Sequence, residues 1–125
     1  MILLLDAHAV IWWLADDSTL LPAARSAIED PANDILVSAA SIWEIGIKRA
    51  LGKLEAPSGL VDALDVAGFD ILPITGADAE RAGSLPAHHR DPFDRMLVAQ
   101  AIRVGAIVVS RDTAFLAYGV DVLAA

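Results

Sequence analysis

Four acidic residues lie where an α/β domain could build a catalytic site. Asp6 follows the apolar run ILLL, and Asp112 lies two residues beyond the apolar run AIVVS. Asp94 falls in the first turn of a predicted helix, and Glu44 lies inside another, at the margin of its apolar face. If both apolar runs are parallel strands, Asp6 and Asp112 project from the same edge of the sheet, where such folds bind ligands.

Clustered carboxylates repel one another, so one of them holds a proton unless a cation is present. A hard divalent cation removes this conflict, because Mg²⁺ and Mn²⁺ take oxygen ligands and retain waters. Such an ion activates bound water and stabilises in-line displacement at phosphorus. Zinc fits less well, since the chain has no cysteine and His88 and His89 are adjacent instead of spaced along one helical face. We interpret this histidine pair as part of a polar loop.

Two of these acids have equally good explanations as helix caps, and a third as a surface ion pair. Asp6 and Asp112 both precede predicted helical segments, and capping is a common use of Asp at such junctions. Glu44 and Lys48 have the i,i+4 spacing of an ion pair that contributes a few tenths of a kcal/mol. These explanations stay open beside the functional one.

The fourth acid belongs to the segment DPFDR, which also has a structural explanation. Asp91 fits an N-cap with Pro92 at the first helical position, which makes Asp94 the third residue of the helix. The helix dipole favours an acid there. Taken singly each structural explanation suffices, but three of the four acids are expected near sheet-edge or helix-start positions, where active sites are built, and together they favour a site.

The elements that would position these acids alternate between strand and helix. The predicted strands are residues 2–6, 34–38, 69–74 and 106–110, with a possible edge strand at 120–123. The predicted helices start near Asp6 and cover 21–30, 38–52, 59–68, 76–86 and Pro92–Val104, followed by a helical turn at 111–119. This alternation predicts an α/β domain with a mainly parallel sheet.

Composition narrows the class of protein. The 125 residues suit one domain spanning 1–125, and 56% of them are hydrophobic, enough for a sizeable core. No apolar run approaches the ~18 residues of a membrane span, and we expect no signal peptide, no membrane association and a cytoplasmic location. The net charge of −8 argues mildly against a nucleic-acid partner. Basic residues near the acids could still supply local positive potential; they are Lys48, Arg49, Arg95 and Arg111.

Four segments together resemble the PIN-domain ribonucleases, and most closely the VapC-type toxins of bacterial toxin–antitoxin pairs. The segments are LLLDAHAVIWWLADD, SAASIWEIGIKRALGKLEAP, HHRDPFDRMLVAQA and IVVSRDTAFLAYGV. The resemblance runs from Met1 to about Val122. It implies a PIN-like three-layer sandwich, with the sheet between two layers of helices.

The resemblance also implies a Mg²⁺- or Mn²⁺-dependent endoribonuclease whose acidic quartet maps onto Asp6, Glu44, Asp94 and Asp112. Asp6 and Asp94 would be the principal metal ligands, with the other two acids holding waters or a second ion. Ser110 matches the small hydroxyl residue that commonly precedes the last acid. The expected supporting residues are Asp91, as a cap or a partner of the ligands, and Lys48, Arg95 and Arg111 near the substrate. Arg95 and Arg111 have an equal alternative, which is pairing with Asp or capping carbonyl groups.

The partners implied by the resemblance are an RNA substrate, a small antitoxin protein that inserts a segment toward the acidic site, and a second copy of the chain in a homodimer. Two alternatives remain: a PIN-fold nuclease of RNA maturation or DNA processing, and a non-catalytic interaction module in which the acids only cap helices. Trp12 and Trp13 cannot both face one side of a helix. Either one of them lies at an interface or both are largely buried.

Overall fold

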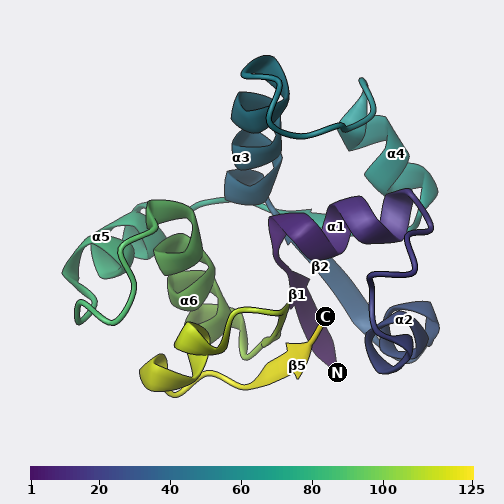
Figure 1. Ribbon diagram of the computed structural model, residues 1–125. Helices are drawn as coiled ribbons and strands as arrows, with labels where there is room; N and C mark the ends of the chain where they lie inside the picture. The colour runs from purple at the N-terminus through teal and green to yellow at the C-terminus, as the bar shows by residue number, and fades with distance from the viewer.

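Five short strands form one parallel sheet at the centre of the computed structural model, which describes residues 1–125 (Figure 1). The strands are β1 (Ile2–Leu5), β2 (Asp34–Ser38), β3 (Asp70–Leu72), β4 (Ile107–Ser110) and β5 (Val122–Ala124). Their order in the sheet is β3-β2-β1-β4-β5, and all neighbours are parallel. The predicted α/β class is confirmed, and the segment after Gly119 does form an edge strand.

Helices cover both faces of this sheet and complete a three-layer sandwich (Figure 1). They are α1 (Ala7–Leu14), α2 (Pro22–Glu29), α3 (Ala39–Ala50), α4 (Leu60–Val66), α5 (Gly76–Ser84) and α6 (Pro92–Val104), with a 3₁₀ helix, η1 (Thr113–Tyr118). Strand alternation divides the core, because Leu3 and Leu5 of β1 pack toward α1, α2 and α4. Leu4 points to the opposite face, where α6 and η1 cover it.

The strand order creates a crevice beside the central strand. The chain moves from β1 outward to β2 and β3, then crosses to β4 on the other side of β1. The connections after β1 and β4 therefore diverge, and parallel α/β folds bind ligands at the carboxyl ends of such strands. Asp6 directly follows β1, and Ser110 ends β4.

Local signals set most element boundaries. Helix α6 has the predicted bounds, because Asp91 caps its first turn and Gly105 ends it with φ of 69°. Strand β3 is shorter than predicted and stops before Pro73, which has no N–H to donate to a sheet. No helix has the length and apolar character needed to cross a membrane.

Candidate active site

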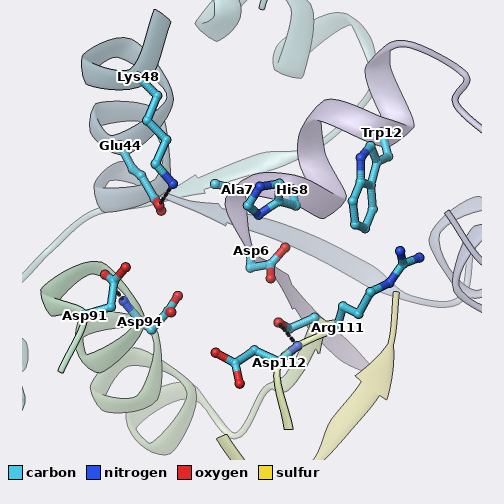
Figure 2. Close-up of a pocket in the computed structure, with 11 residues that line it drawn as sticks. Asp6, Ala7, His8, Trp12, Glu44, Lys48, Asp91, Asp94, Arg111 and Asp112 are labelled. Atoms are coloured by element: carbon cyan, nitrogen blue, oxygen red, sulfur yellow. Dashed lines mark hydrogen bonds and ion pairs between the residues drawn. The ribbon is translucent and has the colours of Figure 1, made fainter. Parts of the chain in front are cut away.

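The four predicted acids line one cleft at the carboxyl ends of β1 and β4 (Figure 2). The cleft has a volume of about 390 Å³. Its lining consists of Asp6, Ala7, His8, Trp12, Glu44, Lys48, Asp91, Asp94, Ser110, Arg111 and Asp112. Five of these residues carry carboxylates and only two carry permanent positive charge. The predicted convergence of the acids is therefore present in the structure, and it brings in segments from opposite ends of the chain.

Asp6 both caps α1 and faces the cleft. Its backbone N–H donates to the Val109 carbonyl at 3.1 Å, and its Oδ1 accepts from the Ala9 N–H at 2.9 Å. Burial raises the pKa of the Asp6 carboxyl, and hydrogen bonding from Ser110 and Ala9 offsets only part of this increase. The capping explanation is thus correct for Asp6, and it leaves the carboxylate fixed at the mouth of the crevice.

Asp94 is the most strongly perturbed acid of the cleft. Burial, followed by the charge of Asp91, raises its pKa from 3.8 to about 7, and the charges of Glu44 and Asp6 add to this effect. Asp91 lies one turn earlier as the N-cap of α6, where its Oδ1 accepts from the N–H groups of Phe93 at 2.8 Å and Asp94 at 3.3 Å. The cap thus orients the turn and also adds negative charge beside Asp94.

Asp112 reaches the same cleft from the segment after β4. Its Oδ1 accepts from the Ala114 N–H at 2.9 Å, which caps η1, and its own N–H donates to Ser110 Oγ at 3.0 Å. The Ala114 hydrogen bond lowers the pKa of the Asp112 carboxyl, with further lowering by His89. Ser110 is buried and connects Asp112 with Asp6, whose carboxyl it also restrains.

Glu44 comes from the first half of α3 and is only 6% exposed. Lys48 pairs with it, with 2.7 Å between Nζ and Oε2, and this hydrogen bond raises the pKa of the Lys48 ammonium. The predicted i,i+4 pair is therefore present, but it lines the cleft instead of an open surface. Lys48 also lies in the field of Asp91 and Asp94.

The two predicted arginines, Arg95 and Arg111, donate hydrogen bonds to backbone carbonyl groups, which was the alternative to substrate binding. Arg95 donates to the carbonyl groups of Ala82, Leu85, Pro86 and His89, and it does not line the cleft. Arg111 does line the cleft, but it donates to the backbone oxygen atoms of Thr19 and Ala125. Its guanidinium also lies 4.5 Å from the centre of the Trp12 ring. Both arginines thus hold neighbouring segments in place.

The adjacent tryptophans divide between two environments. Trp12 is half-buried and forms one wall of the cleft next to His8, with ring centres 5.6 Å apart. Trp13 is also half-buried and packs against Phe69 at 5.9 Å between ring centres. Neither residue is fully buried, and Trp12 contributes to the site.

One site residue was missed in the sequence. Both histidines lie in a loop, as interpreted, and His88 is exposed, but the half-buried side chain of His89 faces the acids of the cleft. The Nε2 atom of His89 lies 2.7 Å from Asp112 Oδ2 and 3.0 Å from Asp94 Oδ2. The only local signal is its position two residues before the cap Asp91, whose N–H donates to His89 Nδ1 at 3.1 Å.

The donor set of the cleft fits a hard divalent cation. Its ligand atoms are carboxylate oxygens from four elements, with one imidazole at the margin and no thiolate. Lys48 neutralises Glu44, but no lysine or arginine pairs with Asp6, and Asp94 keeps a proton up to about pH 7. A bound Mg²⁺ or Mn²⁺ would offset this repulsion with the oxygen coordination that these ions prefer.

Comparisons with known proteins agree with this geometry. The family model described as PIN domain matches residues 3–120. Ribonuclease VapC22 of Mycobacterium tuberculosis (strain ATCC 25618 / H37Rv) is 33% identical over 117 residues, covering 87% of this chain and 85% of the relative. VapBC2 from Rickettsia felis, bound to a promoter DNA fragment, gives a TM-score of 0.70 at 14% identity, with 98% of each chain covered. DNA-bound VapBC from Salmonella typhimurium gives 0.70 at 16% identity, with 98% and 97% covered.

Proposed function

This chain belongs to the PIN domain family, and from that premise we propose that it is a metal-dependent endoribonuclease and the toxin of a type II toxin–antitoxin pair. The observation that carries the proposal is the meeting of Asp6, Glu44, Asp94 and Asp112 in one cleft at the crevice of the sheet. The ribonuclease name of the 33% identical relative supports the RNA substrate. We treat residues 1–125 as one PIN domain.

Asp6 and Asp94 would hold the cation, directly or through water, with Glu44 and Asp112 holding further waters or a second ion. When bound, the cation supplies an activated water and neutralises charge that develops on the scissile phosphate. The protein fixes the carboxylates beforehand, since Asp6 and Asp112 are each held by a cap hydrogen bond. The Ser110 side chain also restrains the carboxyl of Asp6 by a hydrogen bond.

Lys48 is the basic residue of the cleft best placed to meet an RNA phosphate. Its ammonium is tied only to Glu44, whereas the guanidinium of Arg111 is engaged by backbone oxygens and by Trp12. We therefore assign substrate binding to Lys48 and a supporting role to Arg111.

The test is cleavage of an RNA panel by the purified chain with Mg²⁺, Mn²⁺ or EDTA. We expect cutting only with a divalent ion, and a loss of at least ~100-fold in Asp6→Asn, because a metal site supplies several kcal/mol of transition-state stabilisation. Asp65→Asn is the matched control, since Asp65 is exposed on α4 and lies outside the cleft. Its activity should equal that of the wild type.

Other outcomes separate the alternatives. Cleavage of single-stranded or branched DNA in preference to every RNA would indicate a DNA-processing nuclease. Cleavage confined to precursor RNAs would indicate a role in RNA maturation. Failure to bind Mg²⁺ or Mn²⁺ below the millimolar range, together with unfolding of Asp6→Asn, would mean that the acids only cap helices.

We also propose a cognate antitoxin, because several of the structures that this fold matches are VapBC complexes. The five carboxylates of the cleft would attract a basic segment of such a protein when no cation is bound. Co-expression with the product of a neighbouring small reading frame should give a stable complex that does not cut RNA. Recovery of the chain alone, fully active, would contradict this assignment.

A homodimer is a separate proposal. Trp43 is 65% exposed beside Phe93, at an apolar cavity of about 250 Å³ that also contacts Ile74 and Met96. Light scattering of the purified chain should give twice the monomer mass of 13.2 kDa, and Trp43→Glu should shift it toward the monomer. A wild-type chain that is monomeric at micromolar concentration would overturn the proposal.

A further inference from the structure

The loop before α6 places an imidazole between two acids of the cleft. His89 Nε2 lies 2.7 Å from Asp112 Oδ2 and 3.0 Å from Asp94 Oδ2, and the His89 side chain is only 18% exposed. Asp94 belongs to α6 and Asp112 follows β4, and no hydrogen bond links their side chains directly. The imidazole is therefore the bridge between these two carboxylates.

The second ring nitrogen defines which form of the imidazole makes this bridge. His89 Nδ1 accepts a hydrogen bond from the Asp91 N–H at 3.1 Å, so Nδ1 carries no proton. A hydrogen on Nε2 can then be donated to Asp112 Oδ2, and Asp94 Oδ2 lies close to the same nitrogen.

The backbone of His89 is held as firmly as its ring. Its N–H donates to Tyr118 Oη at 2.8 Å, and the Tyr118 hydroxyl in turn donates to the Pro86 carbonyl at 2.8 Å. Arg95 Nη1 donates to the His89 carbonyl at 3.3 Å. Tyr118 ends η1 and Asp112 caps its start, so both ends of one short helix fasten the same loop residue.

We propose that His89 is a positioning residue that sets the placement of Asp94 and Asp112 for cation binding. This proposal rests on the proposed metal-dependent function. Each carboxylate keeps lone pairs for a metal ligand besides those that face Nε2. Hydrogen-bond partners of this kind orient metal ligands, and their loss typically lowers metal affinity by 10–100-fold.

Three substitutions divide the functions of the ring. His89→Leu removes both nitrogens, His89→Asn keeps a short acceptor for the Asp91 N–H, and His89→Gln keeps an N–H donor at about the reach of Nε2. Titration with Mn²⁺ alone, followed calorimetrically, measures the effect without RNA. We expect the dissociation constant for Mn²⁺ to rise about 10–100-fold in His89→Leu and His89→Asn. In His89→Gln the affinity should return most of the way to that of the wild type.

His88→Leu is the matched control, because His88 is adjacent and exposed, and its ring packs against the Tyr118 ring instead of the acids. Its Mn²⁺ affinity should equal that of the wild type. Thermal unfolding in EDTA checks that every variant is folded. RNA cleavage by His89→Leu should also be weak at low Mn²⁺ and recover as Mn²⁺ is raised, which a general loss of structure would not produce.

Two results would overturn the positioning role. Unchanged or tighter Mn²⁺ binding by His89→Leu would mean that the ring competes with the cation for the carboxylates. Recovery by His89→Asn but not His89→Gln would mean that the ring only stabilises the turn before α6. The proposed function fails separately, if the wild type binds Mn²⁺ in a His89-dependent way but cuts no nucleic acid.

Discussion

Asp78 on α5 and Asp94 on α6 lie on helices that pack together, yet their carboxylates have opposite surroundings. Asp78 is 2% exposed and is fully paired: Arg103 donates to Oδ1 at 2.7 Å and to Oδ2 at 3.0 Å, and Thr75 completes a capping box. Burial raises its pKa, but Arg103 and Thr75 outweigh burial and leave the pKa below 3.8. Asp94 instead faces other acids, and its pKa rises to about 7.

The contrast teaches how to separate structural acids from functional ones in this molecule. A buried acid that serves the fold has a cation and N–H groups that stabilise its charged form. The acids of the cleft are held by backbone hydrogen bonds, but too few basic side chains lie near them. Their carboxylates therefore repel one another in the folded chain. That uncompensated charge marks the place where a cation is needed to complete the site.

The largest expected effect is on RNA cleavage, when a carboxylate of the cleft is replaced by a neutral amide. Asp94→Asn should lower RNA cleavage by at least ~100-fold at saturating Mn²⁺, because a neutral amide is a poor ligand in a site worth several kcal/mol. Asp78→Asn should keep the wild-type rate per folded molecule, since Asp78 lies outside the cleft. Equal losses in both variants would remove the distinction between the two regions.

The next effect is on stability, and here the structural acid Asp78 matters instead of the acids of the cleft. Asp78→Ala should lower the free energy of unfolding by about 2 kcal/mol, because it removes the buried carboxylate that completes the capping box with Thr75 and accepts two hydrogen bonds from Arg103. Thermal unfolding should show a decrease of roughly 5–10 °C. Glu80→Gln, an exposed acid on the same helix, is the control and should unfold like the wild type.

The sequence predicted the sheet and the acidic quartet because both depend on local signals. Apolar runs mark the strands; Asp6 directly follows one of them, and Asp112 lies two residues beyond another. The bounds of α6 were correct because a cap and a glycine enclose it. Parallel strands then bring their carboxyl ends together, so the acids meet without knowledge of any long-range contact.

His89 could not be assigned in the same way. Its contact with Asp112 joins residues 23 apart, and its backbone is held by Tyr118, 29 residues away. Loop conformation of this kind depends on tertiary contacts that no periodicity encodes. The carbonyl contacts of Arg95 and Arg111 were open alternatives for the same reason, because a guanidinium can reach many partners.

A smaller effect is expected in how the free energy of unfolding depends on pH. The pKa of Asp94 is raised in the folded state, so between pH 4 and about 7 the folded chain holds a proton that the unfolded chain releases, and stability without metal falls as pH rises. Asp94→Asn should therefore be more stable than the wild type by about 1 kcal/mol at pH 8 in EDTA, after allowance for solvent screening. The difference should disappear near pH 4, and Asp65→Asn should show no gain. A variant less stable than the wild type at pH 8 would contradict repulsion at this site.

The smallest effect concerns the support behind the cleft. Tyr118→Phe removes the hydroxyl that accepts from the His89 N–H and donates to the Pro86 carbonyl, while the ring stays in place. Two hydrogen bonds near the surface contribute about 0.5–1 kcal/mol, so thermal unfolding should change by only a few degrees. Mn²⁺ affinity should fall by less than in His89→Leu, because the ring nitrogens still bridge Asp94 and Asp112. A loss as large as that of His89→Leu would show that the backbone of the loop, and not the imidazole, sets the distance between the two carboxylates.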